Sequence, residues 1–192
     1  MLMGLCVLML VALAPVVGGD LRRLGDLKLR SAGLLFGALL LQILVTDVVS
    51  GGPRLLLIAA HLISYVLAAI FLWQNRRVPG LPLLAVGALS NAVTIALNGG
   101  TLPASASALR RAGIHEAPTK FANSGVLHHP RLAWLGDVFA VPASWPLANV
   151  FSIGDIIIVL AAAQCLWVTC RSTNTQLVPS MAGGLLPRPD PT

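Results

Sequence analysis

Seven polar residues in or beside apolar stretches are the parts of this 192-residue chain that could do chemistry. A polar side chain inside a membrane-spanning helix is costly, so it indicates a functional role unless a neighbouring helix hydrogen-bonds it. A carboxylate or an imidazole could bind a ligand or transfer a proton, and amide and hydroxyl groups could orient that ligand. The candidate binding residues are Asp155, His61, Asn91, Asn98, Thr94, Ser64 and Asp137.

The spacing of these residues predicts that several of them share helix faces. Asn91, Thr94 and Asn98 follow i, i+3, i+7 spacing, and His61 and Ser64 follow i, i+3 spacing. If their helices pack together, these faces form a polar pocket that opens toward the outer leaflet. The alternative is ordinary interhelical hydrogen bonding, which is the better account for Asn91, Thr94 and Ser64.

Asp155 also has two interpretations. A carboxylate inside a span favours a binding or proton-transfer role. However, Ser152 can cap a helix whose first turn contains Asp155, and the helix dipole favours an anion at that position. The sequence leaves both interpretations open.

The sequence predicts no metal site and no cofactor. Histidines and carboxylates in the polar loop include His115, Glu116, His128, His129 and Asp137, but their spacing matches no metal motif. If a metal were bound, His115, His128 and His129 would be its candidate ligands. No phosphate loop, dinucleotide fingerprint or hydrolase motif is present, so no catalytic residue can be assigned.

The composition predicts an integral membrane protein, because 56% of the residues are hydrophobic and only 10% are charged. The net charge of +6 comes from basic residues between apolar runs, which indicates membrane topology rather than nucleic-acid binding. The cysteines also lie in apolar segments, and their number gives no disulfide framework. They are Cys6, Cys165 and Cys170.

Five apolar runs predict an all-α bundle of about five transmembrane helices within residues 1–170. The first run has no basic segment before it, so we expect a retained span rather than a signal peptide. The positive-inside rule places the N-terminus outside, the C-terminus in the cytoplasm and the loop 98–149 on the outer side of a bacterial cell membrane. We expect residues 171–192 to form a disordered cytoplasmic tail. The predicted spans are residues 2–18, 33–49, 55–73, 81–97 and 150–168.

The long outer loop is predicted to be partly helical. Ser105 can cap a short helix over residues 106–112, and Gly113 can end it. Residues 132–141 are too short to span and too apolar to remain in water, so we expect an interfacial or re-entrant helix there. In the second span, Gly33 and Gly37 form a small-x-x-x-small pattern that predicts a tight neighbouring helix, in this chain or in another copy.

Four motifs in this order resemble the domain of unknown function 5317 family of multi-pass bacterial membrane proteins. They are Asn75-Arg76-Arg77-Val78-Pro79-Gly80, Asn98-Gly99-Gly100-Thr101-Leu102-Pro103, Leu135-Gly136-Asp137 and Ser152-Ile153-Gly154-Asp155. The family usually has methionine where this chain has Leu102, an exchange that keeps an apolar contact. The resemblance covers about the first 170 residues, implies a membrane envelope protein and supplies no activity.

Three functions fit the sequence. The first is recognition of a lipid or small amphiphile in a polar outer-leaflet pocket. The second is an accessory or scaffolding subunit of a membrane complex, with another membrane protein or a second copy as its partner. A membrane-embedded enzyme ranks below both, because no nucleophile, base and orienting group can be assembled from the spacing.

Overall fold

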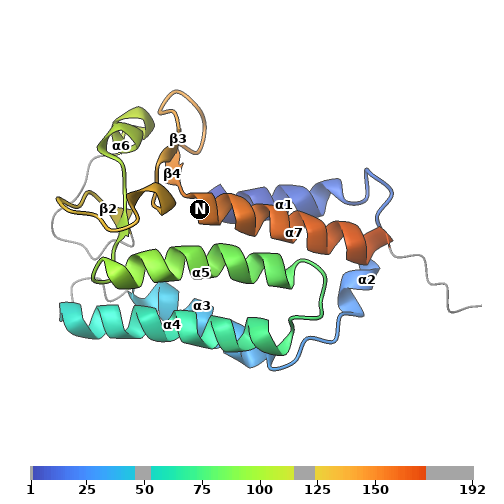
Figure 1. The fold of residues 1–192 in the computed structure, drawn as a ribbon. Coiled ribbons are helices and arrows are strands. Elements are labelled where there is room, and N and C mark those ends of the chain that lie inside the picture. Colours follow the sequence, from blue (N-terminus) through green and yellow to red (C-terminus); the bar gives the residue numbers. More distant parts are fainter. Residues whose placement is uncertain (1, 46–52, 115–123, 172–192) are drawn as a thin grey trace, which may run out of the picture.

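The structure is a computed structural model that describes residues 2–45, 53–114 and 124–171. Helices α1, α4, α5 and α7 run roughly along one direction in Figure 1, and α3 crosses behind α4 at an angle. The described chain is mostly helical, which confirms this part of the predicted fold class. The long helices are α1 (Leu2–Leu13), α3 (Ala32–Ile43), α4 (Arg54–Gln74), α5 (Leu81–Leu97) and α7 (Ile153–Arg171).

The helices follow the predicted apolar runs with some shifts at their ends. Helix α5 has the bounds of the fourth run, and α4 extends the third run by one residue at each end. Helix α1 stops at Leu13, before the predicted end at residue 18, because Pro15 disfavours helical backbone in the residue before it. Helix α7 begins later than residue 150, because residues 149–151 form a strand. Residues 46–49 of the second run lie outside the described residues.

Two described segments, Leu55–Gln74 and Ile153–Arg171, are long and apolar enough to cross a membrane. Within their most apolar windows only 28% and 17% of the residues are buried, so most of this apolar surface faces outward. The core helix of a soluble protein would instead be mostly covered. Helices α1, α3 and α5 are apolar but shorter.

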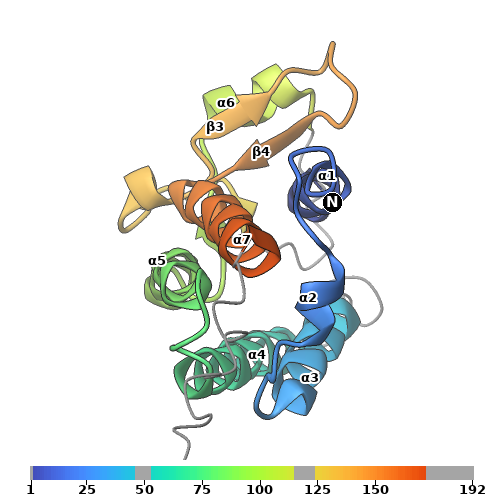
Figure 2. The same ribbon diagram turned by 90° about the vertical axis from the view of Figure 1, so that its right-hand side faces the viewer.

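The helices pack as two pairs that meet at α4 and α5. Helix α5 packs along α7, α3 packs along α4, and α1 lies against α7. Figure 2 shows the same helices from one end, with α7 between α1 and α5. The fully buried side chains include Thr94 and Ile95 of α5 and His61 of α4, so the core follows these two helices.

The predicted glycine contact is not made by Gly33 and Gly37 within the described chain. A Cβ added to either glycine would meet no atom within 4 Å. The close approach occurs instead at Gly87 of α5, where an added Cβ would lie 2.6 Å from the carbonyl oxygen of Gly154. The expected tight neighbour in the same chain is therefore wrong for these positions, and packing against another copy stays a prediction.

One end of the bundle, which we call the arginine end, holds α2 (Arg22–Gly25) and the turn between α4 and α5. The Asn75 side chain joins this turn to the segment between α2 and α3: its Oδ1 accepts from the Arg30 N–H at 2.8 Å, and its Nδ2 donates to the Arg30 carbonyl at 2.9 Å. Gly80, with a φ of +84°, lies so close to α7 that a Cβ would be 2.4 Å from the Ala161 carbonyl oxygen. The motif of residues 75–80 therefore holds three helices together at this end.

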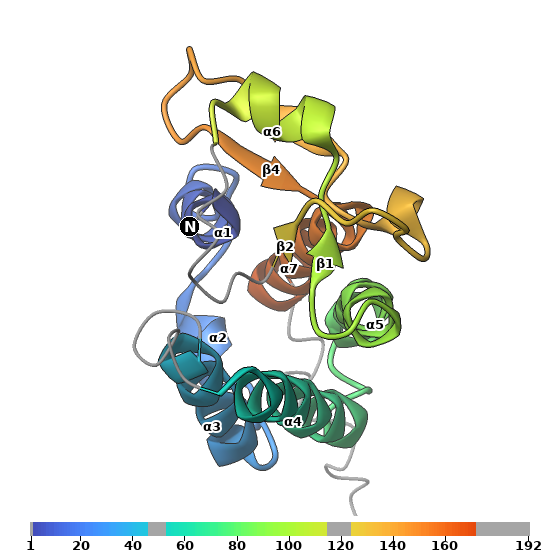
Figure 3. The ribbon, with the colours of Figure 1, turned by 90° about the vertical axis from the view of Figure 1, so that its left-hand side faces the viewer.

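The opposite end carries a small folded cap, defined as residues 98–114 and 124–151. In Figure 3 its elements lie over the ends of α5 and α7. Strands β1 and β2 pair in parallel, strands β3 and β4 pair antiparallel, and α6 packs against β3 and β4. The cap elements are β1 (Leu102–Pro103), α6 (Ala106–Ala112), β2 (Ser124–Gly125), the 3-10 helix η2 (Ala133–Leu135), β3 (Phe139–Val141) and β4 (Asn149–Phe151).

The helix predicted over residues 132–141 is wrong. Only residues 133–135 form a short 3-10 helix, and Gly136 then takes an extended conformation. The chain stays extended because the Asp137 N–H donates to the Pro103 carbonyl at 2.8 Å and Phe139 pairs with Phe151 in the hairpin. The short helix over residues 106–112 is confirmed.

The ends of α6 only partly follow the prediction. Gly113 ends the helix with a φ of +66°, as expected of a glycine stop. Ser105 occupies the position before the helix, but its hydroxyl is hydrogen-bonded to that of Ser107 at 2.8 Å and does not cap the backbone. The hydroxyl pair therefore replaces the predicted cap.

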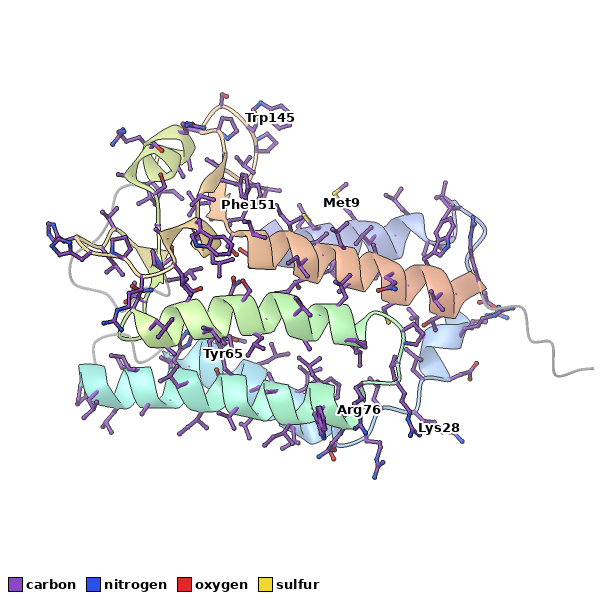
Figure 4. The ribbon with its side chains drawn as sticks, in the orientation of Figure 1. Met9, Lys28, Tyr65, Arg76, Trp145 and Phe151 are labelled. Carbon is purple, nitrogen blue, oxygen red and sulfur yellow. The ribbon has the colours of Figure 1, made fainter. Side chains whose placement is uncertain are left out.

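Tryptophans are exposed at both ends of the bundle. Trp73 and Trp167 lie at the arginine end, where Arg76 and Arg171 stack over their rings. Trp134 and Trp145 lie on the cap, and Figure 4 shows Trp145 on the other side of the molecule from Arg76. Amphipathic rings at both ends of an apolar bundle match the aromatic belts of membrane proteins.

Candidate functional site

A polar cluster lies where α7 begins beneath the cap. The Asn91 Nδ2 donates to Oδ1 of Asp155 at 3.1 Å, and the Ser152 hydroxyl donates to Oδ1 of Asn91 at 2.9 Å. The Ser152 N–H donates to Oδ2 of Asp155 at 3.0 Å, and the Asp155 N–H donates to the Ser152 hydroxyl oxygen at 3.1 Å. The last two bonds form a reciprocal cap of the kind expected at a helix start.

Glycines allow α5 and α7 to come close enough for these bonds. A Cβ on Gly154 would lie 2.2 Å from Oδ1 of Asn91 and 2.8 Å from the Gly87 carbonyl oxygen. Small residues that let helix backbones approach are the usual device for packing helices in membranes. The serine, the glycine and the aspartate of the motif at residues 152–155 therefore have distinct roles: capping, close approach and hydrogen bonding to α5.

Asp137 is a second carboxylate near the same cluster. Its backbone is fixed from both sides, because its N–H donates to the Pro103 carbonyl and its own carbonyl accepts from the Ser105 N–H at 3.0 Å. Gly136 makes this pairing possible, since a Cβ there would lie 2.0 Å from the Pro103 carbonyl oxygen. The motifs at residues 98–103 and 135–137 therefore join as one structural unit.

The environment of Asp137 favours its protonated form. The pKa of its carboxyl group is raised to about 6, mainly by burial; a hydrogen bond from Ser124 opposes this rise, and the negative charge of Asp155 adds to it. The Ser124 hydroxyl donates to Oδ2 of Asp137. The charge of Asp155 thus acts on the carboxyl group of Asp137 at the cap end.

The deeper polar residues bond mainly along their own helices. The Ser64 hydroxyl donates to the His61 carbonyl at 2.6 Å, and the Thr94 hydroxyl donates to the Ser90 carbonyl at 2.8 Å. His61 is fully buried and meets the Tyr65 ring edge-to-face, with 5.1 Å between the ring centroids. Both bonds lie within one helix, whereas the sequence favoured hydrogen bonds between helices for Ser64 and Thr94.

Asn98 connects α5 to the cap. Its Oδ1 accepts from the Arg131 N–H at 2.8 Å, and its Nδ2 donates to the carbonyls of Arg131 and Thr94, both at 2.8 Å. Asn75 holds Arg30 in the same way at the other end. Each asparagine directly follows a helix and fixes a segment distant in sequence.

The proposed metal ligands are only partly described. His115 and Glu116 lie outside the described residues. His128 and His129 are exposed. Within the described ranges no group of three or more histidine, cysteine, aspartate or glutamate residues lies close enough together to hold a metal ion.

Sequence reasoning placed Asn91 and Asp155 in the candidate site, and the structure brings them into contact. It did not identify Ser124 or Gly87, because neither belongs to a recognised motif and each acts through a residue distant in sequence. Ser152 was expected only as a cap, yet its hydroxyl also reaches Asn91. Gly87 of α5 and Gly154 of α7 face each other, and this contact can be recognised only when the two helices are seen packed together.

The model of the family described as "Family of unknown function (DUF5317)" matches residues 26–167. The chain belongs to this family. The resemblance carried by the four motifs is therefore confirmed, and the match includes α3, α4, α5, the cap and most of α7.

A relative from Thermotoga maritima is 31% identical over 101 residues and bears the description "Uncharacterized protein". The match covers 50% of this chain and 55% of that protein, so the chain spans about half the length of the relative. No solved structure matches the chain. The comparisons thus identify the family and name no activity.

Proposed function

We propose that this DUF5317 member crosses a cell membrane about five times, with the cap outside and the arginine end in the cytoplasm. The outward-facing apolar surface of α4 and α7 supports this placement, as do the exposed tryptophans at the two ends. The basic residues gather at the arginine end, which the positive-inside rule assigns to the cytoplasm. They are Arg22, Arg23, Lys28, Arg30, Arg76, Arg77 and Arg171.

In this setting, we propose that the cap end binds the head group of a lipid or small amphiphile of the outer leaflet. The observation that carries the proposal is two carboxylates at the cap end. Asp155 lies in the first turn of α7 and accepts from Asn91 and Ser152, and the backbone of Asp137 is fixed by Pro103 and Ser105. Two acidic groups at one site favour a ligand that brings hydrogen-bond donors or positive charge. We therefore propose a head group with an ammonium or hydroxyl function.

The hydrogen bonding of Asp155 leaves capacity for such a ligand. One bond from Asn91 reaches its Oδ1 and one from Ser152 reaches its Oδ2, whereas a carboxylate offers about four acceptor positions. The side chain is half-buried rather than sealed. Asn91 and Ser152 would then hold the carboxylate in a fixed orientation, and an incoming ammonium group would relieve the repulsion between Asp155 and Asp137.

Substituting Asp155→Asn should weaken binding of phosphatidylethanolamine at least about tenfold, since one charged partner of the head group is lost. Binding would be measured by native mass spectrometry during lipid titration in mild detergent. Asp137→Asn should also weaken binding of phosphatidylethanolamine. This substitution leaves the hydrogen bonds between Ser152 and Asp155 at the start of α7 intact. Asp20→Asn, an exposed carboxylate at the arginine end, is the matched control and should have no effect.

Equal affinity in the wild type and both cap-end variants would contradict the proposal. A protein partner that co-purifies in fixed stoichiometry, with no bound lipid, would instead favour an accessory subunit. Both results come from the same mass spectra, because bound lipids and bound proteins differ greatly in mass.

A further inference from the structure

A groove between α1 and α7 near the arginine end forms a second candidate binding site. Its cavity volume is about 240 Å³, below the roughly 300–1,000 Å³ of pockets for drug-sized ligands. Its walls are apolar, although Leu13, Val17 and Trp167 are each about half exposed. Residues that line it include Leu10, Leu13, Val17, Leu166, Trp167 and Arg171.

Arg171 stands at the mouth of this groove. Its guanidinium lies over the Trp167 ring, 3.7 Å from the ring centroid, and its Nη2 donates to the Val17 carbonyl. These contacts connect the Arg171 side chain to both walls of the groove, Trp167 on one and Val17 on the other. They use one N–H donor of the five that a guanidinium has. A planar guanidinium fixed in this way matches the oxygen atoms of a phosphate group.

The charge around the mouth is positive. Helix α2, which packs against α7, contributes Arg22 and Arg23. The acidic side chains on the same segment are Asp20, whose Oδ1 accepts from the Arg22 N–H at 3.0 Å, and Asp26 at the end of α2. The whole arginine end carries seven basic and two acidic residues in the described chain. Its charge therefore complements an anionic head group.

We propose that this groove binds one acyl chain of an anionic phospholipid, whose phosphate is held by Arg171. The apolar groove takes a hydrocarbon chain, and the basic mouth distinguishes an anionic lipid from a zwitterionic one. Basic sites between helices on the cytoplasmic side are a common form of lipid recognition in membrane proteins. This site depends on the proposed function only in requiring that the protein lies in a membrane. It does not depend on the cap-end site, because it lies at the other end of the bundle.

The test is a native mass spectrometry titration of the full chain in mild detergent with phosphatidylglycerol, phosphatidylcholine or oleate. The wild type should retain phosphatidylglycerol over phosphatidylcholine. Arg171→Gln should reduce phosphatidylglycerol retention about fivefold, the factor expected for one arginine near an anionic surface. Leu13→Trp, which places a larger side chain in the groove, should weaken binding without changing the charge.

Arg76→Gln is the matched control, because Arg76 also stacks over a tryptophan, 4.6 Å from the Trp73 centroid, but does not line the groove. It should leave phosphatidylglycerol binding unchanged. Equal losses in Arg76→Gln and Arg171→Gln, or unchanged binding in Leu13→Trp, would overturn the site. Tighter binding of oleate than of phosphatidylglycerol would overturn the phospholipid assignment, and a dimer abolished by Leu13→Trp would assign the groove to a second copy.

The two proposed lipid sites can be refuted independently of each other. Asp155→Asn should not change phosphatidylglycerol retention, and Arg171→Gln should not change phosphatidylethanolamine binding. If a single variant abolished both, the explanation would be unfolding, which the thermal midpoint of the same sample detects. A normal midpoint together with a selective loss at one end would support that site alone.

Discussion

Gly154→Ala should destabilise the protein by about 3 kcal/mol, because the new Cβ has no room between α5 and α7. It would lie 2.2 Å from Oδ1 of Asn91 and 2.8 Å from the Gly87 carbonyl oxygen. Moving Asn91 aside would break its hydrogen bonds to Asp155 and Ser152, and moving the backbone would separate the helices. The thermal midpoint in detergent should fall by on the order of 10 °C.

Gly37→Ala is the control for this experiment, since it makes the same change in a helix where a Cβ would meet nothing within 4 Å. It should leave the midpoint unchanged or raise it slightly, because alanine favours helix more than glycine does. If Gly37→Ala were as destabilising as Gly154→Ala, the close contact between α5 and α7 would not be the cause.

Asp137 should make the cap less stable as the pH rises. Its folded-state pKa of about 6 lies above the ordinary value of 3.8, so the folded state holds the proton more tightly than the unfolded state does. The resulting stability is fully present below about pH 4 and is lost as the pH rises through about 6. A difference of about two pKa units corresponds to about 3 kcal/mol.

Asp137→Asn should remove this pH dependence, because an amide has nearly the same shape, keeps an oxygen for the Ser124 hydroxyl and does not ionise. Relative to the wild type, the variant should gain up to about 3 kcal/mol between pH 4 and pH 7. Thermal unfolding measured across this range provides the comparison. A constant difference between the two proteins would mean that Asp137 has an ordinary pKa.

The positions of the helices could be predicted because they depend on local sequence. Long apolar runs and their glycine and proline boundaries located α4 and α5 to within a residue at each end. The expected helix over residues 132–141 failed because its backbone partners, Pro103 and Phe151, lie far away in sequence. The periodicity of apolar residues gives no information about backbone hydrogen bonds to segments that are distant in sequence.

The candidate site was predicted as a set of residue types rather than as a geometry. The sequence left a binding role and a place in a capped first turn as alternatives for Asp155. The structure shows the capped turn, and the binding role stays a proposal. Its contact with Asn91 required the register of α5 against α7, which Gly87 and Gly154 determine. The sequence contains these glycines but does not indicate that they face each other.

Thiol labelling in intact cells can test whether the helices carry the chain across a membrane between the cap and the arginine end. In a variant with Cys6, Cys165 and Cys170 replaced by alanine, single cysteines would be introduced as Ser144→Cys on the cap and Arg77→Cys at the arginine end. Both positions are exposed. A membrane-impermeant maleimide should label residue 144 in intact cells and residue 77 only after permeabilisation. Labelling of both positions in intact cells, or the reverse order, would show that the cap and the arginine end do not lie on the proposed sides of the membrane.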